Sequence, residues 1–203
     1  MTNRKIKHLV LIDDPDGSRV DYYPNWLPFK DSLKLFDELK RSLPLEIKQI
    51  TLFGQQVDQP RLTSWHGDPN KSYTYSKLTV TPEPWTPELS FIKNKLNEFL
   101  GYNFNSVLAN YYRDGQDSIA PHSDAENELG PSKHNRVIAS VSLGEARNFC
   151  LRHKTNKTVT QLDLQFGSLL VMSGTTQQHY THEVAKTKKE VKDRLNLTYR
   201  III

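Results

Sequence analysis

Two histidines and one aspartate have the types and the spacing of a metal site. His122 and Asp124 are separated by a single residue, and His182 follows much later in the chain. Side chains two residues apart on a strand point to the same side, so His122 and Asp124 can reach one metal ion. Two histidines and one carboxylate on one face of an octahedral ion leave the opposite positions free, which is typical of oxygen-activating non-heme Fe(II) sites. The pattern predicts such a site.

Each of these residues is weak evidence when it is taken alone. Surface histidines beside aspartates are common, and His134, His153 and His179 offer alternatives to His182 as the second histidine. The distinguishing feature is a segment behind His182 that carries two arginines, Arg194-Leu195-Asn196-Leu197-Thr198-Tyr199-Arg200. A guanidinium binds a carboxylate through two parallel hydrogen bonds and stays charged when buried. An arginine in this segment suits the distal carboxylate of a 2-oxo acid co-substrate.

The elements that must position these residues are mainly strands. From residue 106 onward, short apolar segments alternate with turn residues, which is typical of a β-sandwich or jelly roll. The expected strands are 106–112, 137–143, 148–153, 158–164, 168–172, 182–185 and 194–203.

The sequence before residue 106 predicts two helices and two further strands. The strands are 6–12 and 46–53, and a polar stretch at 54–70 reads as a long loop with some strand in it. One helix is expected at 31–42, with Leu33, Phe36 and Leu39 on its buried face. The second begins at Thr86-Pro87 and ends at Gly101, because threonine is a helix cap and proline is tolerated in the first turn. Its expected buried stripe is Leu89, Ile92, Leu96 and Phe99.

The composition indicates an ordinary folded domain. The chain has 203 residues, of which 36% are hydrophobic, so one sizeable core can form. A formal net charge of +4 permits nucleic-acid binding without requiring it. Cys150 is the only cysteine, which excludes an internal disulfide and fits a reducing compartment. Neither a membrane span nor a secretory signal is visible, so we expect the nucleus or the cytoplasm.

Seven short motifs follow one another along the chain from about residue 52 to residue 203. They are Phe53-Gly54, Pro60-Arg61, Gly67-Asp68, Tyr73-Thr74-Tyr75-Ser76, Asn110-x-Tyr112, His122-x-Asp124 and the segment from Arg194 to Arg200. In this order and spacing they resemble the AlkB family of Fe(II)- and 2-oxoglutarate-dependent dioxygenases, and most of all its animal-type DNA repair branch. The arginine segment is the most specific element and Phe53-Gly54 the least.

The resemblance implies a fold, a domain organisation and a cofactor set. The fold is α+β and mainly β, a double-stranded β-helix (jelly roll) with two helices from the N-terminal half packed on one sheet. Residues 1–203 form a single domain, in which about 1–105 are an extension with nucleotide-recognition loops and about 106–203 are the catalytic core. The cofactors are Fe(II), 2-oxoglutarate as co-substrate, and O2. Family motifs put Arg200 on the distal carboxylate of 2-oxoglutarate, with Asn110, Tyr112, Arg194 and Thr198 around the same molecule.

The resemblance also implies a substrate, alkylated DNA, on which the protein acts as a monomer. Tyr73 and Tyr75 contact and stack on the extruded base, since an enzyme that modifies a base must take it out of the stack. Phe53, followed by Gly54, matches a finger that fills the vacated space. Alternatively, Phe53 packs in the core as the last residue of the strand 46–53. Several cations are candidates for phosphate contacts: Arg61, Arg113, Lys133, Arg136, Arg152, Lys154 and Lys157.

Two departures from the duplex-repair members leave the preference for single or double strands open. The first of the two acids that follow the metal-binding aspartate is replaced by Ala125, so that Glu126 alone remains to touch the substrate. The loop at 154–157 is short where those members have a longer basic loop.

The resemblance as a whole implies oxidative demethylation of bases such as 1-methyladenine and 3-methylcytosine in DNA. The alternatives are the same chemistry on RNA or on a protein side chain, or a non-enzymatic metal-binding module.

Overall fold

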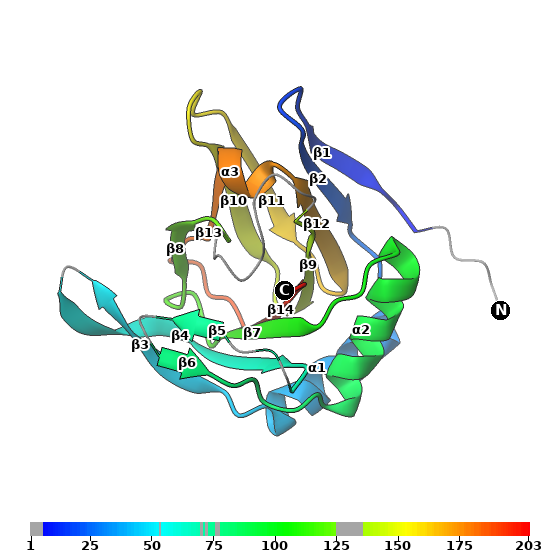
Figure 1. The fold of residues 1–203 in the computed structure, drawn as a ribbon. Coiled ribbons are helices and arrows are strands. Elements are labelled where there is room, and N and C mark those ends of the chain that lie inside the picture. The colour runs from blue at the N-terminus through cyan, green and yellow to red at the C-terminus, as the bar shows by residue number, and fades with distance from the viewer. Residues whose placement is uncertain (1–5, 53, 70, 72, 76–77, 125–135) are drawn as a thin grey trace.

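Two β-sheets face each other across an interior that opens to one side (Figure 1). The computed structural model describes residues 6–52, 54–69, 71, 73–75, 78–124 and 136–203. The mainly β, jelly-roll architecture predicted from the sequence is confirmed.

The larger sheet has eight strands and contains the arginine segment near its centre. Its order is β1 (Leu9–Asp13), β2 (Ser18–Tyr23), β12 (Ser168–Gly174), β9 (Ile138–Gly144), β14 (Arg194–Arg200), β7 (Ser106–Tyr112), β4 (Gln55–Gly67) and β3 (Glu46–Leu52).

The smaller sheet carries both histidines of the predicted triad. Its order is β11 (Val159–Leu164), β10 (Arg147–His153), β13 (Tyr180–Val184) and β8 (Ile119–His122). A separate pair, β5 (Tyr73–Tyr75) and β6 (Leu78–Val80), lies beside β4 in Figure 1.

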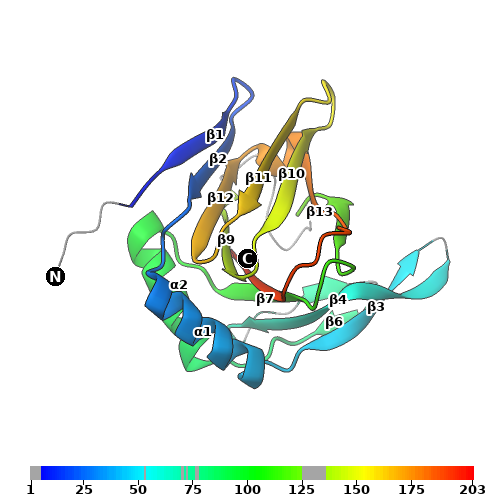
Figure 2. The same cartoon turned by 180° about the vertical axis from the view of Figure 1, so that it is seen from behind.

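The central strands of the large sheet are buried on both faces, and the two faces have different chemistry. One face is apolar and packs against the helices α1 (Phe29–Ser42) and α2 (Pro87–Leu100), which lie together outside the sheet (Figure 2). On β14 that face is formed by Leu195, Leu197 and Tyr199, each fully buried. The opposite face, with Arg194, Asn196 and Thr198, points into the space between the sheets. Alternation along one strand therefore separates core packing from the chemistry.

Helix α2 agrees with the sequence prediction at both ends. The Thr86 side chain accepts a hydrogen bond from the backbone N–H of Leu89 at 3.2 Å. Gly101 ends the helix with φ +75°, a left-handed conformation that favours glycine. The predicted stripe is correct for Leu89, Ile92 and Leu96, but wrong for Phe99, whose side chain is 38% exposed. Phe99 lies at the last turn and packs against the rings of Tyr23 and Trp26.

Helix α1 begins at Phe29, earlier than the sequence predicted, and uses a partly different face. Leu35 and Leu39 are buried, while Leu33, expected in the core, is 46% exposed. The buried stripe is Ser32, Leu35 and Leu39, and the helix packs against β9 and α2, contacts that periodicity alone does not specify.

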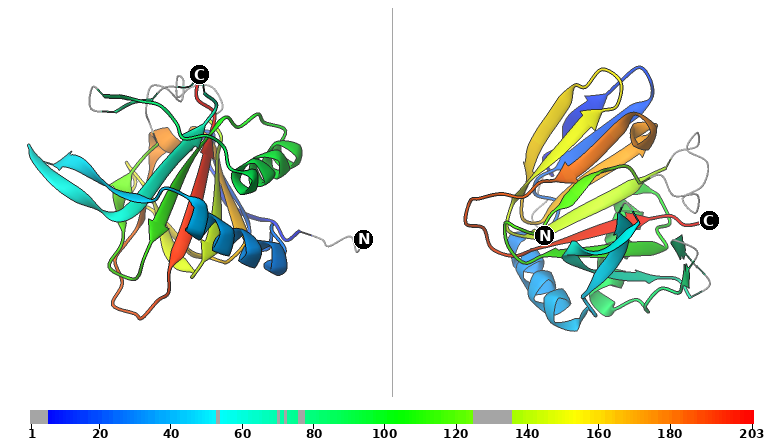
Figure 3. Two further views of the ribbon diagram at one scale, coloured as in Figure 1. Left: turned by 90° about the horizontal axis from the view of Figure 1, so that it is seen from below. Right: turned by 90° about the vertical axis from the view of Figure 1, so that its left-hand side faces the viewer.

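The polar stretch at 54–70 is largely a strand and not a loop. β4 runs from Gln55 to Gly67 and pairs with β3 and then with β7. Together β3 and β4 form a hairpin that extends beyond the rest of the molecule (Figure 3). The strands β2, β8, β5 and β6 and the short helix α3 (Thr176–His179) were also missed.

No helix in the described part of the chain has the length and apolar character needed to cross a membrane.

Candidate active site

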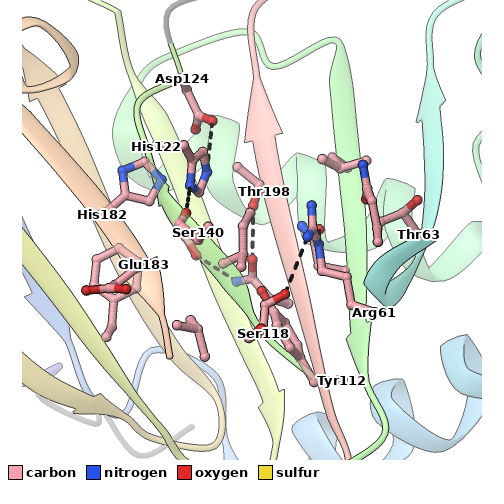
Figure 4. Close-up of a pocket in the computed structure, with 18 of the residues that line it drawn as sticks. Arg61, Thr63, Tyr112, Ser118, His122, Asp124, Ser140, His182, Glu183 and Thr198 are labelled. Carbon is pink, nitrogen blue, oxygen red and sulfur yellow. Dashed lines mark hydrogen bonds and ion pairs between the residues drawn. The ribbon is translucent and has the colours of Figure 1, made fainter. Parts of the chain in front are cut away.

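A cavity of about 970 Å³ opens between the two sheets. Its walls are the inward faces of β7, β14 and β4 on one side and of β8 and β13 on the other (Figure 4). The lining includes, among others, the predicted residues Arg61, Asn110, Tyr112, His122, Asp124, His182, Arg194, Thr198 and Arg200.

His122, Asp124 and His182 meet at one wall of this cavity. His122 is the last residue of β8 and lies directly opposite His182 of β13, with ring centroids 4.3 Å apart. Asp124 follows just beyond the strand, and its Oδ1 lies 3.8 Å from Nε2 of His122. One ligand atom from each residue falls within 4.8 Å of the others. This separation suits three ligands of one metal ion.

The orientation of His122 and the protonation state of His182 suit metal binding. Nδ1 of His122 lies 2.9 Å from the carbonyl oxygen of Ala120, and because a carbonyl only accepts, Nδ1 carries a proton. Nε2 is the ring nitrogen of His122 that lies toward Asp124. Burial lowers the pKa of His182 to about 3, so its imidazole is neutral near pH 7.

Asp124 is buried and held by groups from three other parts of the chain. Nη2 of Arg200 donates to Oδ1 of Asp124 at 2.8 Å, and Nη1 of Arg136 donates to its backbone carbonyl at 3.1 Å. The backbone N–H of Asp124 donates to Oε1 of Gln177 at 2.9 Å. Burial alone would raise the pKa of Asp124, but the positive charge of Arg200 more than offsets it, so the pKa is lowered and the carboxylate is ionised.

The inward face of β14 carries a row of polar groups. Thr198 donates from Oγ1 to Oδ1 of Asn196 at 3.0 Å, and Nδ2 of Asn196 donates to the Ser140 hydroxyl at 2.7 Å. Arg194 continues this row six residues before Arg200 on the same strand.

Arg194 is a buried cation with unused donors. Its side chain is 1% exposed, and Nη2 donates to the Ser142 hydroxyl at 3.0 Å. Nε and Nη1 have no hydrogen-bond partner among the described residues. The guanidinium lies 5.2 Å from the ring centroid of Tyr112, and burial lowers its pKa. A buried cation of this kind needs an anion to satisfy it.

Asn110 and Arg61 form a buried pair in the cavity wall. Nε of Arg61 donates to Oδ1 of Asn110 at 2.8 Å. Arg61 is only 8% exposed, and Arg136, at 9%, is bound to the backbone of Asp124. Both arginines, which the sequence offered as candidates for phosphate contacts, are therefore buried side chains and not surface cations.

Comparison with known proteins agrees with this geometry. The sequence profile of the 2OG-Fe(II) oxygenase superfamily matches residues 19–200. The mouse DNA oxidative demethylase ALKBH2 is 38% identical over 181 residues, which are 84% of this chain and 74% of that protein. The bovine alpha-ketoglutarate-dependent dioxygenase alkB homolog 3 is 38% identical over 201 residues, 93% of this chain and 68% of that protein. The chain belongs to the AlkB family of 2OG-Fe(II) oxygenases.

The fold of this AlkB-family chain also matches a solved structure. "The structure of OsALKBH1" superposes with a TM-score of 0.62 at 20% identity, covering 90% of this chain and 97% of that one. The cofactors predicted from the sequence are confirmed by family membership: this enzyme is a dioxygenase that uses Fe(II), 2-oxoglutarate and O2.

The side chains of the AlkB-family site fit these cofactors. Oδ2 of Asp124 and Nδ1 of His182 are buried and have no hydrogen-bond partner among the described residues. One carboxylate and two imidazoles are the donor set that non-heme Fe(II) accepts. The unused donors of Arg194 fit a carboxylate in the same cavity.

The two arginines of β14 have different surroundings. Arg200, predicted from the sequence on the distal carboxylate of 2-oxoglutarate, donates from its guanidinium to Asp124. Arg194, six residues earlier, has two buried donors, Nε and Nη1, without a hydrogen-bond partner among the described residues. The sequence correctly put both on one face and could not tell which of them lay nearer Asp124.

The predicted substrate residues are described only in part. Phe53 and Glu126 lie outside the described residues, as do the side chains of Tyr73 and Tyr75 in β5. Gly54 lies at the tip of the β3–β4 hairpin with φ +80° and is exposed. A side chain at this position would be strained, which accounts for glycine there.

A second histidine–aspartate cluster lies near the base of α3. Oδ2 of Asp16 lies 3.6 Å from Nε2 of His153 and 3.6 Å from Nδ1 of His179. Nδ1 of His153 accepts backbone N–H groups from Thr155 and Asn156, both at 3.2 Å. Neutral His153 must then carry its proton on Nε2, which removes the lone pair that a metal would need. The cluster is a charge–dipole contact between neighbouring segments and not a second metal site.

Three buried residues in or beside this site were not predicted from the sequence. Asn196 could have been predicted, because it lies on the same strand face as Arg194 and Thr198. Arg147 donates to the carbonyls of Asp114, Asp117 and Ala185, each at 2.9 Å, and no motif marks it. Gln177 contacts a backbone N–H, a role that leaves no pattern in the sequence.

Proposed function

We propose that His122, Asp124 and His182 hold Fe(II) and that the protein oxidatively demethylates N-alkylated bases in DNA. The observation that carries the proposal is a single cavity lined both by these three residues and by Arg194. A metal-binding triad and a buried cation with unused donors in one cavity suit a metal-bound diacid co-substrate.

Arg194 is proposed to receive the distal carboxylate of 2-oxoglutarate. The contact would satisfy the unused Nε and Nη1 donors, which face no acceptor among the described residues. Tyr112 packs against the guanidinium and fixes its plane, and Asn110 and Thr198 line the same wall. Arg200 orients the Asp124 carboxylate through its hydrogen bond to Oδ1.

The protein's part in the reaction is to hold and orient. When bound, Fe(II) and 2-oxoglutarate allow O2 to be consumed as the co-substrate becomes succinate and CO2 and a methyl C–H of the base becomes C–OH. The resulting N-hydroxymethyl group leaves as formaldehyde and the base is restored. Apolar residues of the cavity wall, Phe149, Leu164 and Met172, exclude water from this region.

The substrate proposal rests on the relatives named DNA oxidative demethylase and on the shape of the entrance. The 38% identical mouse relative carries that name. The projecting β3–β4 hairpin, whose residues 48–50 and 59–61 line the cavity, stands where a duplex or single strand would approach. We infer that Phe53, Gly54, Tyr73, Tyr75 and Glu126 contact the extruded base or the gap that it leaves, with 1-methyladenine and 3-methylcytosine as substrates.

We further infer that residues 1–203 act as a single catalytic domain and as a monomer, in the nucleus or the cytoplasm. Arg61 is assigned to the cavity, where it holds Asn110, and not to the phosphate backbone. Light scattering on a size-exclusion column tests the oligomeric state.

The direct test is mass spectrometry of methylated oligonucleotides. Single- and double-stranded DNA and RNA, each with one 1-methyladenine or 3-methylcytosine, are incubated with protein, Fe(II), 2-oxoglutarate and ascorbate. We expect loss of the methyl group from DNA, with formaldehyde and succinate in equal amounts. The Asp124→Ala variant is the control, because it lacks the carboxylate ligand.

Other outcomes would separate the rival functions. Demethylation of RNA alone would move the substrate to RNA. Consumption of 2-oxoglutarate without demethylation of any oligonucleotide would point to another substrate class. No consumption of 2-oxoglutarate at all would contradict the enzyme proposal.

A further inference from the structure

Helix α3 is a single turn that comes immediately before the strand carrying His182. It is held by hydrogen bonds to two other parts of the chain. The Thr176 hydroxyl accepts the backbone N–H of Arg19 in β2 at 3.0 Å, and Nζ of Lys154 donates to the backbone carbonyl of Gln177 at 3.0 Å. Thr176 and Gln177 are 1% and 4% exposed. A turn held in this way provides a fixed reference point beside the cavity.

The side chain of Gln177 bridges this turn to the predicted aspartate ligand. Its Oε1 accepts the backbone N–H of Asp124 at 2.9 Å, and its Nε2 lies 3.4 Å from Sδ of Met172. An N–H group can bond only to the oxygen of the amide, so the orientation of the side chain is determined. Met172 in turn lines the cavity wall.

A second bond joins the same two segments. Oγ of Ser123 donates to the backbone carbonyl of Tyr180 at 2.8 Å, at the start of β13. His182 lies two residues farther along β13. The segment 176–182 therefore holds one ligand covalently and the other through Gln177, although Asp124 and His182 are far apart in the sequence.

We propose that Gln177 is a positioning residue for the metal site, one that sets the backbone of Asp124 against β13 and so fixes the separation of two ligands. The inference rests on the proposed assignment of Asp124 and His182 as ligands. Groups that orient metal ligands without touching the metal change metal affinity by about 10- to 100-fold when they are removed.

The alternative is that Gln177 only fills space beneath the cavity. The two roles predict different results for a substitution that keeps the shape and removes the acceptor. Methionine has nearly the same volume and length as glutamine, and it would pack against Met172 without accepting the N–H of Asp124. Gln177→Met therefore separates positioning from packing.

The test is a titration of the apoprotein with Co(II), followed by the visible d–d absorption of the bound ion. We expect wild type to bind one Co(II) per chain and Gln177→Met to bind it about tenfold more weakly, with an altered spectrum. Gln177→Glu keeps the acceptor oxygen and should retain the wild-type spectrum. The melting temperature of each apoprotein is measured in parallel, and Gln178→Met, a half-buried glutamine on the same turn, serves as the matched control.

Each outcome decides between specific statements. A wild-type Co(II) affinity and spectrum in Gln177→Met would overturn the positioning role, whatever its melting temperature. Equal weakening in Gln178→Met would also overturn it. If wild type and His182→Ala bind Co(II) equally, the metal-site assignment itself fails, and the inference about Gln177 fails with it.

Discussion

Arg194→Met is expected to make the apoprotein more stable and the enzyme inactive. The guanidinium is buried with Nε and Nη1 unpaired among the described residues, and each buried unpaired donor costs about 1–3 kcal/mol. The substitution removes both, a gain of about 4 kcal/mol at the middle of that range.

Two lost contacts offset part of this gain. The hydrogen bond from Nη2 to Ser142 contributes about 1 kcal/mol. The contact between the guanidinium and the Tyr112 ring contributes about 1 kcal/mol more. The net expectation is a stabilisation of about 2 kcal/mol, which raises the melting temperature by about 4–8 °C in a chain of this size.

The assay compares thermal unfolding with and without excess 2-oxoglutarate in the presence of Mn(II). At a hundred times its Kd, a ligand that binds only the folded state stabilises it by about 2.7 kcal/mol. Wild type should show this increase and Arg194→Met should not. Arg41→Met, at an exposed arginine on α1, is the control for loss of one positive charge. A lower melting temperature of apo Arg194→Met would refute the reasoning, because Arg194 would then be a structural cation.

Three further predictions concern the remaining ionisable groups. Turnover measured by mass spectrometry should vanish in His182→Ala and persist in His179→Ala, and the reverse would exchange the ligand assignment. Arg200→Lys should weaken Co(II) binding more than 2-oxoglutarate binding, because the hydrogen bond goes to Asp124; a defect confined to 2-oxoglutarate would return Arg200 to the distal carboxylate. Burial lowers the pKa of His66 below 6.5, while the unfolded chain titrates near that value, so the unfolding free energy should fall as pH drops from about 6.5 through the folded pKa. Urea unfolding of His66→Phe should show a shallower decline over that range, and an unchanged slope would assign the acid sensitivity to other groups.

The sequence was most informative where one residue type has one physical role. Strand β7 was predicted with its observed bounds, because its apolar alternation lies between clear turn residues. The ends of α2 followed from Thr86 and Gly101, whose cap and left-handed conformations are local properties of the chain. These features need no information about the rest of the fold.

The sequence failed where a strand is defined by a neighbour and not by its own pattern. The first half of β4 is exposed in the projecting hairpin, and its second half turns Arg61 and Thr63 toward the cavity. Neither half shows apolar alternation, so the stretch reads as a loop. The sequence pattern does not reveal strand β8 either, since its four residues form a strand by pairing with β13.

The candidate site also has features that the sequence predicts and features that depend on the rest of the fold. Periodicity along β14 puts Arg194 and Arg200 on one face, but the position of Asp124 relative to them depends on where β8 ends in space. That position decided which arginine contacts the metal-binding carboxylate. Gln177 could not be predicted, because its partner is a backbone N–H that any residue would offer.

The place of β14 in the large sheet has a consequence for how the protein comes to be folded. Among the strands described, β14 follows all the others along the chain, yet it lies between β9 and β7 near the middle of the sheet. Without it, the strands β1, β2, β12 and β9 share no pairing with β7, β4 and β3. During synthesis, the strands on both sides of β14 are therefore made before β14 itself. Until β14 pairs with them, β9 and β7 have unpaired edges, which are sites for aggregation. The sheet can therefore close only after all the other described strands have been synthesised, and the same event brings both arginines to the cavity.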